Sequence, residues 1–191
     1  SLRNLTLKND NDNYGERGQT YAIRIGTQEI ISTFSIENIT MSDGKFDKGV
    51  YVSNASGEIK NSDIQNFCSG IYLDEVSNLI ISGNNISNNG KADECAEASG
   101  EPSTGIDIFY GSNVLIRNNI IHNNDVGIYS YSNCEGEGCS SGILVVNNKI
   151  TDNDGYVASS WEYMSRDPYE IRNDGNNPVQ IGRASCRERV C

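Results

Sequence analysis

The sequence predicts an all-β protein, a parallel β-helix (solenoid) of about six coils built from short repeated units. An internal repeat is the first observation: GIYLDEVSNLIISGNNISNNG, residues 70–90, aligns without a gap with GIDIFYGSNVLIRNNIIHNND, residues 105–125. Second, apolar residues occupy alternate positions of short runs, which is the period of a β-strand. Third, glycine and asparagine lie between these runs, where a sharp turn requires tolerance of positive φ. A unit of about 22 residues cannot bury its own apolar side, so we expect successive units to stack.

In the remaining coils, apolar and turn residues recur at the same positions as in these two copies. One inward position is shared by Met41, Ile64, Ile86, Ile121 and Ile150, and another by Ile36, Ile59, Ile81, Ile116 and Val145. One turn position is shared by Asn38, Asn61, Asn118 and Asn147, with Gly83 in place of asparagine once. We expect a ladder of stacked amides at that turn position. The alternative, an asparagine-rich loop tract, would not hold the apolar phase from coil to coil.

The length of the chain suits one elongated domain. We assign residues 1–180 to the β-helix, with an irregular last coil or cap over 155–180, and find no apolar run of about 18 residues that would span a membrane. The segment IGRASCRERVC, residues 181–191, resembles translated sequencing-adapter DNA, so we set it aside as a non-native tail. We therefore expect a fragment truncated at both ends. Segments 91–104 and 133–141 are insertions that we expect to form surface loops.

The formal net charge of −11 argues against nucleic acid and anionic membrane as partners. An acidic sugar would need a local cation from Arg, Lys or Ca²⁺. The acidic run NDNDN, residues 9–13, is the one candidate for Ca²⁺, but it lacks the glycines and spacing of a calcium loop. We expect a solvated turn there, and no cofactor.

Four cysteines remain when the tail is set aside: Cys68, Cys95, Cys134 and Cys139. Three pairings are open. Cys134 and Cys139 bracket the short loop EGEG, which favours a local bridge, and a bridge from Cys68 to Cys95 would join neighbouring coils. Zinc is disfavoured because the C-x4-C spacing and a single histidine do not make a zinc site. We favour disulfides in an exported protein over reduced structural thiols.

The first strand of each coil predicts a functional face, because residues that follow inward positions point outward. One outward file contains Arg24, Tyr51, Tyr72, Asp107 and Tyr129, and a second contains Ser53, Asp74, Phe109 and Tyr131. Aromatic rings stack on the C–H faces of sugars while carboxylates accept hydrogen bonds from hydroxyl groups, so the two files suit a glycan chain. The alternative is that a tyrosine ladder only stabilises an exposed sheet.

The phrase G-I-x-L/I followed by I-x-N-N-x-I-x-N-N resembles the right-handed parallel β-helix repeat family, the pectate-lyase-like superfamily. That group includes pectate-lyase-like enzymes, alginate epimerases and lyases, phage tailspikes and periplasmic copper-site maturation proteins. The resemblance covers roughly residues 23–154 and implies the right-handed fold. It implies little about activity, because the repeat residues build the coil and carry no chemistry.

We expect a secreted, cell-surface or periplasmic bacterial protein that binds a polysaccharide. The sequence leaves open whether it also acts on the polymer, and an enzyme of this kind would be a lyase, epimerase or hydrolase. The candidates for acid, base or paired-carboxylate roles are Asp107, Tyr72, Tyr129 and Asp74. Those for substrate binding are Arg24, Tyr51, Phe109 and Tyr131. The epimerase pattern D-P-H-[DE] is absent, since Ile108 and Phe109 follow Asp107, and His122 is expected to be a solvated turn residue. The alternative is a non-catalytic binding or structural module, tailspike-like or adhesin-like; the sequence leaves the oligomeric state open.

Overall fold

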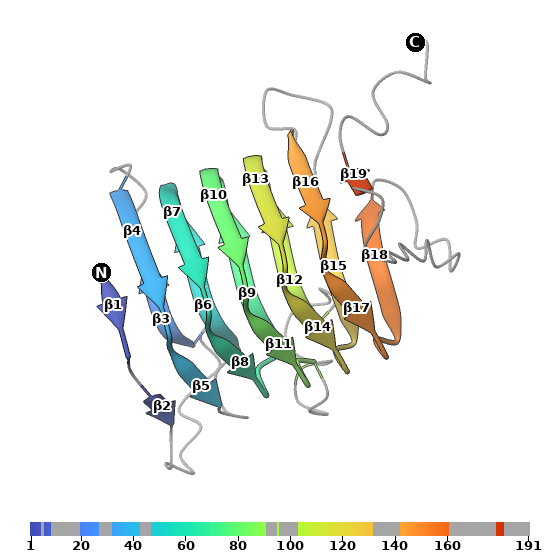
Figure 1. Ribbon diagram of the computed structural model, residues 1–191, viewed down its shortest axis with the longest axis horizontal. Coiled ribbons are helices and arrows are strands. Elements are labelled where there is room, and N and C mark those ends of the chain that lie inside the picture. Colours follow the sequence, from blue (N-terminus) through green and yellow to red (C-terminus); the bar gives the residue numbers. More distant parts are fainter. Residues whose placement is uncertain are drawn as a thin grey trace.

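The computed structural model describes residues 1–4, 6–8, 20–26, 32–42, 47–90, 95, 103–131, 142–160 and 179–181. The chain winds through three sheets in turn, so that each coil adds one strand to each sheet (Figure 1). The N-terminus and β18 (Gly155–Ser160) lie at opposite ends of the stack. This is the predicted parallel β-helix.

Each of the three sheets contains every third strand of the chain. Sheet A consists of β1 (Leu2–Arg3), β4 (Ser32–Glu37), β7 (Ala55–Lys60), β10 (Ser77–Ser82), β13 (Ser112–Arg117), β16 (Ile143–Val146) and β19 (Val179–Ile181). Sheet B consists of β2 (Thr6–Lys8), β5 (Thr40–Ser42), β8 (Asp63–Gln65), β11 (Asn85–Ser87), β14 (Ile120–His122) and β17 (Lys149–Thr151). Sheet C consists of β3 (Tyr21–Ile25), β6 (Lys48–Ser53), β9 (Ser69–Asp74), β12 (Thr104–Phe109), β15 (Val126–Tyr131) and β18.

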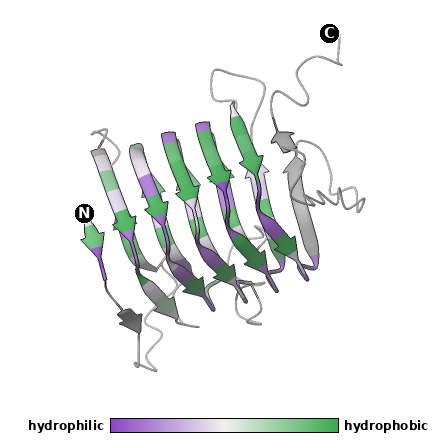
Figure 2. Cartoon of the chain, viewed as in Figure 1, coloured by the Kyte–Doolittle hydropathy of each residue, from purple (hydrophilic) through white to green (hydrophobic). Residues whose placement is uncertain are grey.

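Strand pairing confirms the predicted inward files. In sheet B the direct partners run Met41, Ile64, Ile86, Ile121 and Ile150, and in sheet A they run Ile36, Ile59, Ile81, Ile116 and Val145. Apart from the half-buried Ile150, these side chains belong to one continuous buried core. Hydrophobic residues recur at the same place in successive strands, and hydrophilic segments mark the turns from sheet A to sheet B (Figure 2). Burial of this apolar side in every coil holds the stack together.

The predicted amide ladder is displaced by one residue. Asn38, Asn61, Asn118 and Asn147 adopt positive φ, as does Gly83, and all five residues are exposed. The backbone N–H groups of the first four in coil order, from Asn38 to Asn118, bond to the next coil, as from Asn61 to Ser82 O at 3.0 Å. These positions favour asparagine because it tolerates the left-handed conformation, so the prediction that their side chains stack was wrong.

Buried amides stack at the following position, in the order Asn84, Asn119 and Asn148. Asn84 Nδ2 donates to Ile59 O of the preceding coil and to Asn119 Oδ1 of the next, both at 3.0 Å. Asn119 Nδ2 repeats this pattern with Ile81 O at 3.0 Å and Asn148 Oδ1 at 2.9 Å. Each backbone N–H of Asn84 and Asn119 also donates to the next amide oxygen. The ladder satisfies polar groups that would be costly to bury alone.

A second buried ladder follows sheet B and contains Asn89, Asn124 and Asn153. Asn89 Nδ2 donates to Asn124 Oδ1, and Asn124 Nδ2 donates to Asn153 Oδ1, each at 2.9 Å. Phe67 precedes this ladder and donates its N–H to Asn89 Oδ1 at 3.1 Å. Two corners of the coil are therefore fixed by side-chain amides as well as by strand pairing.

The last described strands extend beyond the sequence pattern. β18 pairs in parallel with β15, so residues 155–160 continue sheet C where we had expected an irregular coil or cap. β19 pairs antiparallel with β16, which places Ile181 next to Ile143. Residues 182–191 of the proposed non-native tail, the acidic run 9–13 and the pair Cys134 and Cys139 lie outside the described residues. Among the residues that the structure describes, no helix is long and apolar enough to cross a bilayer.

Candidate functional site on sheet C

Strand pairing places the predicted outward files side by side on sheet C. Direct partners run Arg24, Tyr51, Tyr72, Asp107 and Tyr129 in one file. In the other they run Ser53, Asp74, Phe109 and Tyr131. We call these two files the sheet C strip. Neighbouring coils lie about 4.8 Å apart, so the strip brings together residues that are distant in sequence.

Aromatic rings of the strip stack on one another. The ring centroids of Tyr51 and Tyr72 lie 5.6 Å apart with an interplanar angle of 18°. Those of Tyr72 and Phe109 lie 5.2 Å apart at 20°. Tyr21 extends the series, with its centroid 4.7 Å from that of Tyr51 and a tilt of 48°. Such offset pairs are favourable, and they leave the faces of the inner rings partly covered by their neighbours.

Two cationic side chains lie over these rings. Arg24 Cζ is 5.4 Å from the Tyr21 centroid and 5.6 Å from the Tyr51 centroid. Lys48 Nζ is 3.4 Å from the Tyr72 centroid. Both cations are within the range of cation–π attraction, which strengthens when water is excluded. Lys48 is only 6% exposed whereas Arg24 is exposed, so Arg24 is the cation that a bound molecule can meet directly.

A tyrosine–carboxylate hydrogen bond joins the two files. The hydroxyl of Tyr51 donates to Asp74 Oδ2 at 2.9 Å. Burial raises the pKa of the Tyr51 hydroxyl above its ordinary value, and the hydrogen bond to Asp74 raises this pKa further. Burial also raises the pKa of the Tyr21 hydroxyl, against the opposing effect of the Arg24 guanidinium. Both hydroxyls therefore stay protonated at neutral pH and act as hydrogen-bond donors.

Tyr72 and Asp107 have the predicted register but little contact with solvent. Tyr72 is 7% exposed because it lies between Tyr51 and Phe109 and beneath Lys48. Asp107 is 1% exposed, between Tyr72 and Tyr129 in its file. Strand alternation placed both side chains on the outer face but could not show how crowded that face is. The more accessible part of the strip is the set of half-buried or exposed residues Arg24, Tyr51, Asp74, Phe109 and Tyr129.

Sequence reasoning missed Tyr21 and Lys48. They are direct partners near the start of β3 and at the start of β6. Strict alternation from Ile23 and Val50 points both side chains inward. The Tyr21 ring nevertheless packs on Tyr51, and the Lys48 ammonium lies over Tyr72. The identity of Lys48 was the available signal, because an ammonium group is almost never placed in an apolar core without a partner. The side chain of Tyr131 lies outside what the structure describes.

Comparison with known proteins now settles the handedness. A family model described as the right-handed β-helix region matches residues 2–174. This chain belongs to the right-handed β-helix family. No curated protein and no solved structure matches it.

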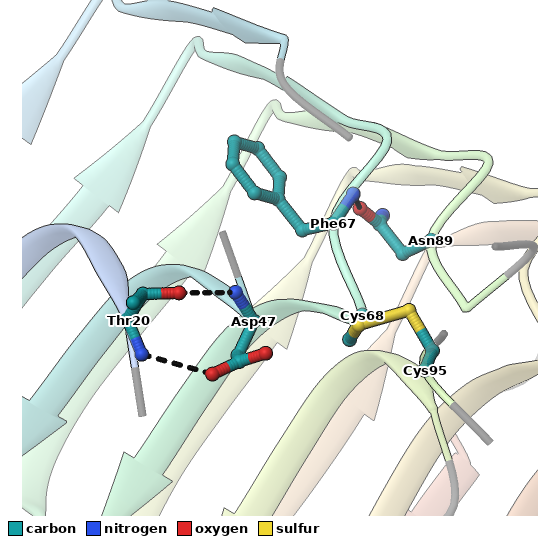
Figure 3. The surroundings of a disulfide bond; sticks show 6 residues. All are labelled: Thr20, Asp47, Phe67, Cys68, Asn89 and Cys95. Carbon is teal, nitrogen blue, oxygen red and sulfur yellow. Dashed lines mark hydrogen bonds between the residues drawn. A yellow bond between two sulfur atoms is a disulfide. The ribbon is translucent and has the colours of Figure 1, made fainter. Parts of the chain in front are cut away.

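One disulfide of this right-handed β-helix lies at the corner before sheet C. Cys68 and Cys95 are bonded and join the turn before β9 to the insertion before β12 (Figure 3). The same corner carries a pair of hydrogen bonds, from Thr20 N to Asp47 Oδ2 at 2.9 Å and from Asp47 N to Thr20 Oγ1 at 3.1 Å. Neighbouring coils are therefore linked at this edge of the strip by side chains as well as by strands.

His122 lies away from the strip, on the outer face of sheet B. Its Nε2 is 3.2 Å from Asn85 Oδ1, and Asn85 Nδ2 donates to Asp63 Oδ1 at 3.0 Å. The half-buried imidazole is thus part of a surface hydrogen-bond chain on a different sheet from Asp107. Within the described ranges, no group of three or more His, Cys, Asp or Glu side chains is placed to hold a metal ion.

Proposed function

We propose that this right-handed β-helix binds a polysaccharide along the sheet C strip. One observation carries the proposal: aromatic, cationic and carboxylate side chains from successive coils stand in register on one outer face. An extended glycan presents similar hydroxyl and C–H groups at regular intervals, which matches a surface repeated coil by coil. Hydroxyl groups of the glycan would bond to Asp74 and Tyr51, and an acidic sugar would approach Arg24.

Binding without cleavage is the form of this proposal that the burial pattern favours. Asp107 would have to contact the reacting atoms to act as a general acid or base, and its side chain is 1% exposed. Tyr129 and Asp74 are more accessible, and a role for them or for Asp107 in lyase or hydrolase chemistry stays a prediction. Turnover would appear as unsaturated products or new reducing ends, and its loss in Asp107→Asn would support the catalytic interpretation.

The proposal includes a location outside the cytoplasm. The disulfide between Cys68 and Cys95 supports this, because such bonds persist in oxidising compartments such as the cell exterior and the bacterial periplasm. The protein would encounter a polysaccharide ligand in these same compartments.

Affinity electrophoresis in gels containing pectate, alginate or a neutral glucan tests the proposal. We expect retardation by at least one polymer, weakened roughly tenfold in Arg24→Ala. Arg117→Ala is the matched control, because Arg117 is an exposed arginine on the outer face of sheet A. If no polymer retards the protein, or if the two arginine variants weaken retardation equally, sheet C is not the binding face.

A further inference from the structure

The corner that follows sheet C has a backbone conformation set by the coil stack. Gly26, Asn54, Glu75 and Tyr110 occupy this corner in successive coils, with φ of 91°, 48°, 52° and 53°. Asn54 N donates to Asp74 O at 3.1 Å, and Glu75 N donates to Phe109 O at 2.9 Å. The left-handed conformation recurs with four different residues, so it belongs to the corner of the coil and not to one residue type.

Tyrosine is a poor residue for such a corner. The left-handed conformation costs roughly 1–2 kcal/mol for a residue with a large side chain, and asparagine and glycine bear it best. Asparagine fills nearly all the described non-glycine positions with positive φ; the exceptions are Glu75, Tyr110 and Asp152. A strained residue at the rim of a candidate site points to a role for its side chain.

The ring of Tyr110 is oriented differently from the inner rings of the strip. Tyr51, Tyr72 and Phe109 are within 20° of their stacked neighbours, so their faces lie against one another. The Tyr110 ring stands at 72° to Phe109, with centroids 6.4 Å apart, and is half-buried. Among the side chains that the structure describes, Tyr110 is thus the last ring in this series of contacts, and it is turned across Phe109 where β12 leaves sheet C.

The residue after Tyr110 holds this corner close to the core. A Cβ at Gly111 would lie 2.5 Å from Ile108 Cγ2 and 3.2 Å from Val114 Cγ2, so only glycine lets the chain pass here. The backbone that carries Tyr110 is thus fixed on both sides, by the core at Gly111 and by β12 before it. With the backbone fixed, only the side-chain torsions of Tyr110 remain to be ordered when a ligand binds.

We propose that Tyr110 is a sugar-stacking residue, which receives the C–H face of a pyranose ring where the sheet C strip meets the corner leading to sheet A. This inference rests on the proposed polysaccharide binding, and it adds a residue outside the two files. It also explains why the corner carries a strained tyrosine where asparagine would fit the backbone better.

The test replaces Tyr110 by the residue that its backbone prefers. Tyr110→Asn should weaken retention by the polymer that binds the parent protein roughly three- to tenfold, while the melting temperature stays equal or rises by about 2–4 °C. Glu75→Asn is the matched control, because Glu75 occupies the same corner one coil earlier. This substitution relieves the same backbone strain without removing an aromatic ring. It should raise stability and leave retention unchanged. Tyr110→Phe keeps the ring and should retain binding.

Each outcome decides the inference. Equal retention of Tyr110→Asn and the parent protein would overturn it while leaving the polysaccharide proposal intact. A lower melting temperature in Tyr110→Asn would also overturn it, because the ring would then serve the stability of the corner. Failure of the parent protein to bind any polymer would remove both proposals together. The inference is supported if Tyr110→Asn shows weaker retention with an unchanged or higher melting temperature, while Glu75→Asn is retained like the parent protein.

Discussion

Replacing Asn119 with alanine tests the buried amide ladder directly. The Asn119 side chain makes four hydrogen bonds: its Nδ2 donates to Ile81 O at 3.0 Å and Asn148 Oδ1 at 2.9 Å, and its Oδ1 accepts from Asn84 N at 2.9 Å and Asn84 Nδ2 at 3.0 Å. Some partners keep another bond, since Asn148 Oδ1 still accepts from Asn119 N and Asn84 Nδ2 still donates to Ile59 O. The group most affected is Asn84 N, because Ile81 O also lies within β10, which pairs with β13.

The magnitude follows from Asn84 N and from the other three lost hydrogen bonds. A buried N–H group that loses its partner costs about 1–3 kcal/mol and each further lost bond about 0.5–1.5 kcal/mol, so Asn119→Ala should lower the free energy of unfolding by about 4 kcal/mol. For a chain of this length the melting temperature should fall by about 10 °C. Asn119 is 1% exposed, so water cannot replace the lost bonds without opening the corner.

The preceding residue supplies the control. Asn118 is exposed, has φ of 55° and shares its turn position with Gly83, so Asn118→Gly should change the free energy of unfolding by less than about 0.5 kcal/mol. Thermal and guanidinium unfolding followed by circular dichroism measures both variants. If Asn118→Gly destabilised the protein as much as Asn119→Ala, the assignment of the ladder to the second asparagine would be refuted.

Two further predictions concern Tyr51 and the disulfide. Burial and the hydrogen bond to Asp74 raise the pKa of Tyr51, so its stabilising effect is present below pH 10 and is lost as pH rises through the folded-state pKa. Melting temperature measured from pH 8 to 11 should therefore fall less steeply in Tyr51→Phe, and a parallel fall would contradict this. The double variant Cys68→Ser/Cys95→Ser should lose about 3 kcal/mol of stability. Dithiothreitol should destabilise the parent protein equally, and a further effect on the double variant would indicate a second bridge among the remaining cysteines, of which Cys134 and Cys139 are the predicted pair.

Strand register could be predicted because its signal is local. An apolar residue at every second position assigns each side chain to the inside or outside of its strand, and the gapless repeat aligns one coil with the next. The files from Ile36 to Val145 and from Arg24 to Tyr129 were both found in this way. The sequence also predicted an asparagine ladder, but at the first residue of pairs such as Asn118 and Asn119 and not at the second.

Which asparagine of a pair stacks depends on the turn. At Asn118 the backbone adopts positive φ and its side chain lies in solvent, while the next side chain enters the interior. Alternation gives no guide across such a corner, because the period of two holds only within a strand. Alternation also fails at the first residue of β6, because the ammonium group of Lys48 lies over the Tyr72 ring although alternation from Val50 points it inward.

By itself the sequence determined the β-helix, its coil boundaries and the residues that share the outer face of sheet C, since these depend on short-range periodicity repeated along the chain. Only the tertiary structure decided that Tyr72 and Asp107 are buried, that Cys68 bonds to Cys95, and that the Tyr110 ring stands across that of Phe109. The physical reason is that burial, bridging and ring orientation depend on how neighbouring coils crowd one another, and that crowding is set by side chains far apart in the sequence.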